Sequence, residues 1–248
     1  MRTLIAAIRF VKFVAATLGL YAFWFIARAF MRDKIRWRQT IFEAWARSFV
    51  SISKMQIVVN GNPPKPPFFL VTNHLSYTDI AAIRTKAKGV FVAKAEVESW
   101  FLAGRICRDM GTIFIDRKNR RDIPRAGELI VERLDAGEGV IDFPEGTSTA
   151  GREVLPFNSS FLEFAAGRDL PVSYAAVTYT TPEGEPAASK VVCWGENIGF
   201  VEHLWQLLKL RSYTAIITFG DAPVTNSDRK LLAAELHDRV DAEFVPVP

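Results

Sequence analysis

Residues 68–79 read FFLVTNHLSYTD and join a continuous apolar run to a polar segment that contains His74 and Asp79. The apolar run over residues 68–72 has the length and composition of a buried strand. A short loop and then a helix over residues 77–87 are expected to follow. A strand, a loop and a helix in this order form the repeating unit of α/β proteins, so this stretch decides the fold class.

The rest of the chain continues this alternation of short apolar runs and helical patterns. Strands are expected at residues 68–72, 89–93, 112–116, 139–143, 172–179, 189–194 and 213–219. Helices are expected at residues 77–87, 97–107, 121–136, 159–167, 201–209 and 228–244. The run from Gly139 to Phe143 is too continuously apolar for a strand with one wet face. We therefore predict an α/β fold with a mostly parallel or mixed sheet covered by helices.

Composition excludes several classes of protein. The chain has 248 residues, of which 49% are hydrophobic and 12% aromatic, so it is neither disordered nor a polytopic membrane protein. Its two cysteines, Cys107 and Cys193, have no metal or redox spacing and are expected to be buried, reduced thiols. The chain contains no zinc-protease, dinucleotide or phosphate-loop motif, so we predict neither a metal nor a cofactor.

The net charge of +4 hides an uneven distribution along the chain. Residues 1–60 hold ten Lys or Arg against two Asp or Glu, a net +8, whereas the remaining residues hold 21 basic and 25 acidic side chains, a net −4. A basic, aromatic-rich arm on a slightly acidic body favours anionic lipid as a partner. No compact basic reading element appears, so we expect no nucleic acid to bind.

An uncharged stretch over residues 13–27 lies inside the basic arm. As a helix it spans roughly 22 Å, short of the roughly 30 Å hydrocarbon core, so it is expected either to cross the membrane marginally or to lie embedded in it. A cleaved signal peptide is disfavoured because Arg28 stands inside the small-residue site 27–29. The next stretch reads as an amphipathic helix, and its basic side chains are expected to face lipid headgroups: Lys34, Arg36, Arg38 and Arg47. A pair of core-packing helices is the alternative.

The Pro-rich segment 60–67 separates this arm from the rest of the chain. We predict a membrane-anchoring helical arm over residues 1–60 and a catalytic domain over residues 61–248. The basic cluster that follows residue 28 favours the cytoplasmic side. The expected location is therefore the cell (inner) membrane, with the catalytic domain facing the cytoplasm.

A histidine and a carboxylate five positions apart suit general-base chemistry. Imidazole exchanges a proton near neutral pH, and a carboxylate can hold its tautomer and stabilise the imidazolium. On one straight helix, five residues leave two side chains about 140° apart. The pair therefore converges only if His74 lies in a loop and Asp79 in the first turn of the next helix. A capping box formed by Ser76 and Asp79 is the alternative.

Two further strands are expected to end at the same edge of the sheet, where sites of α/β proteins gather. Residues 111–117 end in Asp116 and Arg117, and an Arg there can bind a phosphate or carboxylate through two hydrogen bonds. Residues 143–149 form a Pro-x-Gly turn that presents Glu145 at its tip. A surface ion pair and an ordinary β-turn are the alternatives.

Four ordered blocks together resemble the glycerolipid acyltransferase superfamily, of the lysophosphatidic acid acyltransferase (1-acyl-sn-glycerol-3-phosphate acyltransferase) type. The blocks are Asn73-His74-x4-Asp79, Gly111-x-Ile113-Phe114-Ile115-Asp116-Arg117, Phe143-Pro144-Glu145-Gly146-Thr147 and Leu170-Pro171-Val172. The resemblance covers roughly residues 68–180 and is specific because all four blocks occur in order.

This resemblance implies transfer of a fatty acyl group from acyl-CoA or acyl-carrier protein to the free hydroxyl of 1-acyl-sn-glycerol 3-phosphate. The product would be phosphatidic acid, an intermediate of phospholipid biosynthesis. His74 would be the general base and Asp79 its orienting partner. The residues expected to bind substrate are Asp116, Arg117, Glu145, Gly146, Thr147 and Lys94. The expected partners are the lysophospholipid, the acyl-thioester donor and membrane lipids.

Two departures from the family pattern put the acceptor in doubt. Ser148 stands where an Arg commonly follows Thr, and Asn158 stands where a Lys often follows Phe. Arg117, Arg152 or Lys94 are expected to compensate for these cations. Because a zwitterionic acceptor needs less concentrated positive charge, an O-acyltransferase for lyso-ornithine lipid or another lysophospholipid is the alternative.

Two other functional classes remain as weaker alternatives. A serine esterase is disfavoured because no G-x-S-x-G elbow surrounds any serine of the predicted site region: Ser76, Ser148, Ser159 or Ser160. A non-catalytic membrane-binding module, in which the basic arm is the whole function, leaves the four blocks unexplained. His203 and His237 lie in helical patterns and are expected to be structural or surface residues.

Overall fold

The computed structural model describes residues 1–116, 119, 121–195 and 198–248. Within these residues, the strands form one sheet in the order β1-β7-β6-β2-β5-β3-β4. The strands are β1 (Met55–Asn60), β2 (Phe68–Thr72), β3 (Gly89–Lys94), β4 (Ile113–Ile115), β5 (Gly139–Asp142), β6 (Val172–Thr180) and β7 (Tyr213–Phe219). Neighbouring strands are parallel except β6 and β7, which are antiparallel. The prediction of an α/β fold with a mixed sheet is confirmed.

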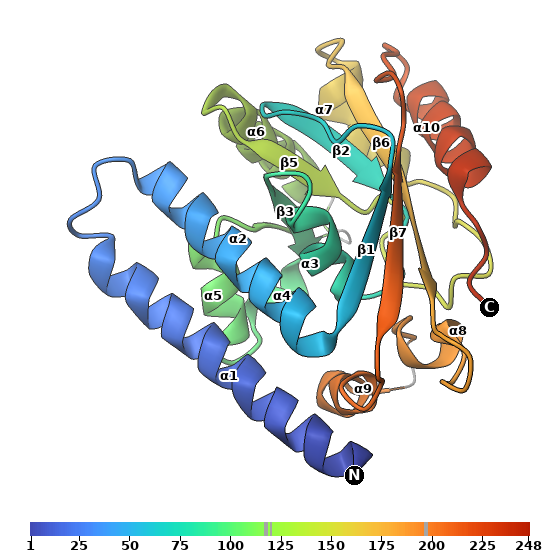
Figure 1. The fold of residues 1–248 in the computed structure, drawn as a ribbon. Coiled ribbons are helices and arrows are strands. Elements are labelled where there is room, and N and C mark those ends of the chain that lie inside the picture. The colour runs from blue at the N-terminus through green and yellow to red at the C-terminus, as the bar shows by residue number, and fades with distance from the viewer. Residues whose placement is uncertain (117–118, 120, 196–197) are drawn as a thin grey trace.

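Helices cover both faces of this sheet. They are α1 (Arg2–Ala27), α2 (Lys34–Ser53), α3 (Thr78–Arg84), α4 (Ala95–Glu98), α5 (Ala103–Asp109), α6 (Asp122–Asp135), the 3-10 turn η1 (Ser159–Leu162), α7 (Glu163–Ala166), α8 (Ala188–Val191), α9 (Phe200–Leu207) and α10 (Arg229–Glu243). Helices α2 and α3 lie on one face, and α6, α7 and α10 lie on the other (Figure 1). The site is therefore built on strands whose side chains are buried on both sides.

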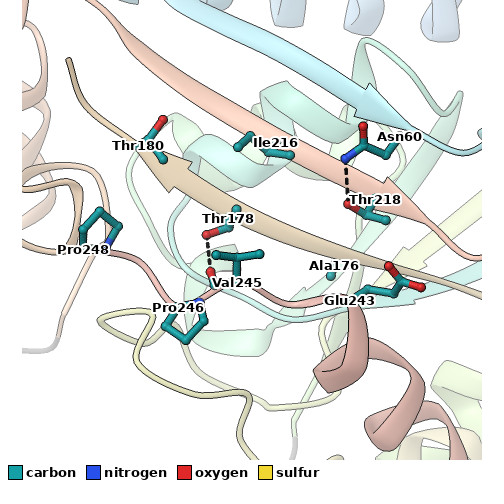
Figure 2. A pocket seen from close by; sticks show the side chains of 10 residues that line it. All are labelled: Asn60, Ala176, Thr178, Thr180, Ile216, Thr218, Glu243, Val245, Pro246 and Pro248. Carbon is teal, nitrogen blue, oxygen red and sulfur yellow. Dashed lines mark hydrogen bonds between the residues drawn. The ribbon is translucent and has the colours of Figure 1, made fainter.

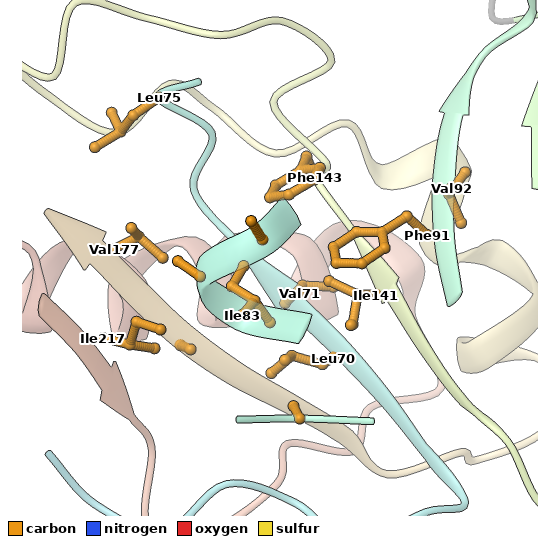
Figure 3. Packing of buried hydrophobic residues seen from close by; sticks show 14 of the residues in the cluster. Leu70, Val71, Leu75, Ile83, Phe91, Val92, Ile141, Phe143, Val177 and Ile217 are labelled. Atoms are coloured by element: carbon orange, nitrogen blue, oxygen red, sulfur yellow. The ribbon is translucent and has the colours of Figure 1, made fainter. Parts of the chain in front are cut away.

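Successive residues of the central strands show why these runs are continuously apolar. The ring of Phe69 lies 5.0 Å from that of Phe164 in α7. The next residue, Leu70, points to the opposite face and packs with Ile83 of α3 (Figure 3). Because side chains alternate between the two faces, a strand covered on both sides needs apolar residues at every position. This arrangement confirms the inference from the central strands.

Two sequence-based assignments of strands differ from the structure. The predicted strand at residues 189–194 is wrong, because Ala188–Val191 forms helix α8 instead. Its apolar residues are buried against neighbouring elements, and a short apolar run does not by itself distinguish a strand from a buried helix. The sequence reading missed β1, which pairs in parallel with β7 from Met55 to Asn60.

Helix α2 packs directly against the core of the sheet. Its residues Phe42 and Phe49 are buried in the same cluster as the sheet, and β1 follows it directly. Arg38 is a correction: the side chain does not face headgroups but is buried, where it binds the carboxylate of Glu138. Glu138 also accepts hydrogen bonds from Gln39 and Arg133. The assignment of residues 1–60 as a separate domain stays a prediction.

Helix α1 presents a long apolar surface to its surroundings. It is long and apolar enough to cross a membrane, and little of it is buried in the protein. It lies along α2, and its Arg9 donates to the carbonyl oxygens of Leu208 and Leu210 at the end of α9 (Figure 1). Among the described residues, its exposed apolar side chains include Leu4, Ile8, Val11, Leu18, Phe23 and Ile26.

The C-terminal residues cross the outer part of the sheet and reach the loop after β5. Thr178 donates to the carbonyl oxygen of Val245, and the backbone N–H of Val247 donates to Gly151 at 2.7 Å. A hollow of about 350 Å³ lies between this tail and strands β6 and β7, lined by Thr178, Thr180 and Thr218 among others (Figure 2). None of the predicted site residues lines it, so we do not place the chemistry there.

We predict that Glu138→Ala destabilises the protein by about 3–5 kcal/mol, because Arg38 would keep its buried charge without a partner. The measurement is the midpoint of thermal or denaturant unfolding in detergent. The matched control is Glu235→Ala, which breaks an exposed pair with Arg239 at 3.3 Å on α10. The control is expected to cost about 0.5 kcal/mol or less. Equal shifts for the two variants would contradict the structural role of Glu138.

Candidate active site

The predicted site residues gather where parallel strands end. Strands β2, β5, β3 and β4 are consecutive and parallel, so their carboxyl ends lie at one edge of the sheet. His74 follows β2, Glu145 follows β5, Lys94 ends β3 and Asp116 follows β4. Crevices at this edge are where α/β proteins bind ligands.

His74 and Asp79 are in direct contact, although they lie on different elements. His74 is in the loop after β2, and Asp79 is in the first turn of α3. The distance between Nδ1 of His74 and Oδ2 of Asp79 is 2.8 Å. Because a carboxylate only accepts hydrogen bonds, Nδ1 carries the proton, and the lone pair of the imidazole lies on Nε2. This is the tautomer that a general base needs.

The carboxylate of Asp79 is fully buried and is held by four donors. Besides Nδ1 of His74, its Oδ2 accepts from the backbone N–H groups of Leu75 at 2.8 Å and Ser76 at 2.9 Å. Its Oδ1 accepts from the hydroxyl of Tyr179 at 2.7 Å, and that hydroxyl accepts from Thr78. A buried carboxylate must be hydrogen-bonded in this way to remain charged. Asp79 therefore makes half of the expected capping box as well as the contact with His74: the N–H of Ser76 donates to it, whereas within the described residues the hydroxyl of Ser76 has no hydrogen-bond partner.

The imidazole of His74 is also fixed from its face. Its ring stacks on Phe143 with centroids 4.1 Å apart and planes inclined by 21°. Phe143 in turn stacks on Phe91 of β3. The side chain of His74 keeps 20% of its surface exposed, whereas that of Asp79 has none. The base is therefore held rigidly and is still open to a reactant on one side.

Glu145 binds the backbone on both sides of the crevice. Its Oε1 accepts from the N–H of His74 at 2.7 Å, and its Oε2 accepts from the N–H of Leu155 at 3.0 Å. Burial raises the pKa of Glu145 to about 7, and these two backbone hydrogen bonds act in the opposite direction. Its carboxylate therefore joins the loop that carries His74 to the loop that carries Leu155, which fixes the backbone of His74. Its predicted role in acceptor binding stays a prediction.

The turn around Glu145 has the backbone that the sequence predicts. Gly146 has φ +80°, a conformation that favours glycine, and its N–H donates to Phe143 at 3.0 Å. Thr147 is partly exposed at the same turn. Ser148 donates to the carbonyl oxygen of Trp194 at 2.6 Å, so this position joins two loops.

Lys94 and Asp116 lie farther along the same edge of the sheet. Strands β3 and β4 are two and three places from β2, which corresponds to roughly 10 and 14 Å at the usual strand spacing. The side chain of Lys94 is exposed, and the backbone N–H of Asp116 donates to Asp122 at 2.7 Å. Arg117 lies outside the described residues. The roles of Lys94 and Asp116 in substrate binding stay predictions.

Two residues hold the site through contacts that the sequence did not reveal. The side-chain amide of Asn73 donates to the carbonyl oxygen of Val177 at 2.9 Å and accepts from its N–H at 2.7 Å, which ties the loop to β6. Tyr179 lies 100 residues from Asp79, so only the folded chain reveals their contact. Asn73 was visible as part of the first block, but its structural task was not.

The other two histidines are not at this centre. His203 is buried, with Nδ1 2.9 Å from the hydroxyl of Tyr77 and Nε2 3.1 Å from the carbonyl oxygen of Cys193. Burial lowers the pKa of His203, which keeps it neutral. His237 binds the carbonyl oxygen of Val154 at 3.2 Å. Across the described ranges, no group of three or more His, Cys, Asp or Glu is arranged to hold a metal.

Comparisons with known proteins agree with this geometry. The family model Acyltransferase matches residues 55–177. A lyso-ornithine lipid O-acyltransferase from Pseudomonas aeruginosa is 30% identical over 243 residues, which are 97% of this chain and 92% of the relative. A 1-acyl-sn-glycerol-3-phosphate acyltransferase from Neisseria gonorrhoeae is 29% identical over 184 residues, which are 73% and 71% of the two chains.

A solved structure has the same fold. The crystal structure of a 1-acyl-sn-glycerophosphate acyltransferase from Thermotoga maritima matches with a TM-score of 0.69 and 22% identity, over 98% of this chain and 97% of that chain. The four sequence blocks, the fold and the relatives thus agree. The chain belongs to the glycerolipid acyltransferase family and is an enzyme that transfers acyl groups to lysolipids.

Proposed function

We propose that His74 is the general base of this acyltransferase and that lyso-ornithine lipid is its acceptor. The observation that carries the first part is the 2.8 Å contact between His74 Nδ1 and the buried carboxylate of Asp79. The second candidate acceptor is 1-acyl-sn-glycerol 3-phosphate, which would make the chain a 1-acylglycerol-3-phosphate O-acyltransferase. It is favoured by the relatives from Neisseria that bear this name.

The reaction needs one proton to move twice. Nε2 of His74 takes the proton of the acceptor hydroxyl while the oxygen attacks the carbonyl carbon of the acyl thioester. The tetrahedral intermediate collapses with loss of the thiolate, which takes the proton from the imidazolium. Asp79 stabilises the imidazolium between these transfers. A positioned base of this kind contributes about 10² to 10⁴ in rate, or roughly 3–5 kcal/mol.

The choice of acceptor rests on charge at the third block. Ser148 replaces the Arg that is common in the family and is engaged with Trp194, so it supplies no cation for a phosphate. A phosphomonoester carries nearly two negative charges, whereas the ornithine headgroup is zwitterionic and needs less concentrated positive charge. The relative from Pseudomonas aeruginosa, which aligns with 97% of this chain, is named for lyso-ornithine lipid.

We further propose that the donor is acyl-CoA or acyl-carrier protein and that the enzyme works at the cell (inner) membrane with its catalytic domain facing the cytoplasm. The apolar surface of α1 supports membrane association. Exposed basic residues follow α1 directly, and basic flanks favour the cytoplasmic side; they are Arg32, Lys34 and Arg36. The aqueous thioester donors are found on that side.

An acyl-transfer assay of the purified full chain across lyso-ornithine lipid and 1-acyl-sn-glycerol 3-phosphate, each with acyl-CoA and acyl-carrier protein, tests the proposed acceptor. We expect kcat/KM for lyso-ornithine lipid to be higher by about tenfold or more, which corresponds to roughly 1.4 kcal/mol. A preference of that size for 1-acyl-sn-glycerol 3-phosphate would establish the second candidate instead.

In the same assay, His74→Ala is expected to lower kcat by about 10² to 10⁴. Arg239→Ala is the control, because Arg239 is an exposed residue of α10 whose ion pair is with Glu235, and it is expected to retain turnover. Retained turnover in His74→Ala would remove the proposed mechanism.

We predict that Tyr179→Phe lowers kcat while the protein stays folded. The substitution removes one donor from the buried Asp79 carboxylate, a loss of about 1.5–3 kcal/mol, or roughly 10- to 100-fold in rate if it is fully felt in the transition state. Tyr213→Phe is the matched control, because this equally buried hydroxyl donates to Ser53 at 3.1 Å and not to Asp79. Similar rates for the two variants would show that the hydroxyl of Tyr179 does not support catalysis.

The pKa of Glu145 predicts how stability depends on pH. The pKa is about 7 in the folded protein against 4.5 for the free group, so between these values the folded state binds more protons than the unfolded state. Stability contributed by this group therefore falls as pH rises from 4.5 to 7. The measurement is the unfolding midpoint of the wild-type chain and of Glu145→Gln at several pH values. We expect the wild-type midpoint, taken relative to that of the variant, to fall as the pH rises through this window. A difference that rises or stays flat would mean that Glu145 remains ionised.

A further inference from the structure

The connection between α4 and α5 carries three consecutive apolar side chains on the surface. Trp100 is 40% exposed, Phe101 is 96% exposed and Leu102 is 41% exposed. We call residues 100–102 the apolar tip. Single exposed apolar residues are ordinary on soluble proteins, but adjacent large ones mark a surface that contacts something.

The backbone of the apolar tip is held in an unusual conformation. Leu102 has φ +56°, a region that bulky residues rarely adopt. Behind it, the N–H of Gly104 donates to the carbonyl oxygen of Trp100 at 2.9 Å. A Cβ at Gly104 would lie 2.1 Å from the carbonyl oxygen of Glu98, so glycine is required for α4 and α5 to pack this closely. The tight packing turns the three side chains outward.

The apolar tip lies on the same side of the molecule as α1. The hydroxyl of Tyr21 in α1 donates to Asp109 at the end of α5, at 2.6 Å. At the other end of α1, the ring of Phe10 lies 6.2 Å from that of Trp205 in α9. Helices α5 and α9 thus both adjoin α1 (Figure 1). Val201, which is 62% exposed, adds an apolar side chain at the start of α9.

Ring contacts link the apolar tip to the loop that carries His74. Trp100 contacts Trp194 at 6.4 Å and Phe200 at 6.1 Å between centroids. Tyr77, three residues after His74, contacts Phe200 at 4.8 Å and Trp194 at 5.5 Å. The N–H of Trp194 also donates to the carbonyl oxygen of Leu75 at 2.7 Å. An apolar surface therefore leads from the tip to the catalytic loop.

We propose that the apolar tip inserts into the same lipid bilayer that α1 contacts, as a second attachment point that sets the active site at the membrane surface. The occupant is lipid because the tip lies beside the apolar surface of α1, which is long enough to cross a membrane. Trp is also the residue that membrane interfaces favour. This inference rests on the proposed function for two points: the acceptor is a membrane lipid, and α1 contacts the membrane.

A fluorescent label placed by single-cysteine substitution tests the insertion. Phe101→Cys carries the environment-sensitive dye NBD in the full chain, reconstituted in vesicles of phosphatidylethanolamine and phosphatidylglycerol with brominated acyl chains. Leu231→Cys is the matched control, because Leu231 is 60% exposed on α10. Burial raises the pKa of Cys107 to about 11 and that of Cys193 to about 12, so the two native thiols are expected to react slowly with the dye. The wild-type chain treated with the same dye serves as the blank.

We expect the brominated lipid to quench the label at position 101 by about twofold or more, because interfacial side chains sit roughly 5–10 Å into the boundary of the acyl chains. The label at position 231 is expected to stay unquenched and accessible to aqueous iodide. Equal, weak quenching at both positions overturns the proposal. The label at position 101 could also be shielded from iodide in a way that depends on protein concentration and not on brominated lipid. That result overturns the proposal, because a second copy of the chain would then cover the apolar tip.

A functional measurement complements the label. Phe101→Asp is expected to raise the apparent KM for an acceptor presented in vesicles by roughly tenfold, because an aromatic side chain that inserts into the lipid is replaced by a charge. Leu231→Asp is expected to leave that KM unchanged. An unchanged KM in Phe101→Asp contradicts the proposal. The quenching result requires no turnover, so it stands or fails independently of the proposed acceptor.

Discussion

The buried carboxylate of Asp79 is the constraint on which the site depends. A charge with no exposed surface needs donors, and these come from the ring of His74, two loop N–H groups and Tyr179. Three of the four donors belong to the loop after β2, and the fourth lies at the far end of β6, so these bonds tie that loop and β6 to the first turn of α3, which carries Asp79. Because all of them converge on one carboxylate, the position of the base is set by the same bonds that keep the charge stable in the interior.

The sequence predicted what is local or periodic and missed what depends on distant partners. The alternation of apolar runs predicted the α/β sheet, and the spacing of His74 and Asp79 predicted a loop followed by a helix turn. The contact of Tyr179 with Asp79 joins residues 100 positions apart, and so does the ion pair of Arg38 with Glu138. No pattern within a short window reveals such a pair, so Arg38 read as a surface cation. The predicted role of Glu145 in acceptor binding stays a prediction, and its two backbone partners appear only after folding.

Ser148 in the third block connects two loops of the site. Ser148 joins the turn after β5 to Trp194, and Trp194 in turn binds the loop of His74 through its N–H. A short hydroxyl side chain suits this contact. The same residue thus provides a link between two loops and no positive charge, and the proposed acceptor rests on the second of these properties.

The ion pair between Arg38 and Glu138 bears on how the enzyme meets its substrate. A buried ion pair is seldom more stable than an apolar pair of the same size, so its value lies in specifying one arrangement. Here it fixes α2 against the turn before β5, and α1 lies along α2. The apolar surface of α1 is thereby held at a constant orientation to the strand ends that carry His74. A base that must reach a hydroxyl at a defined depth in a bilayer needs such a fixed orientation, and we infer that this need accounts for burying two charges in the core.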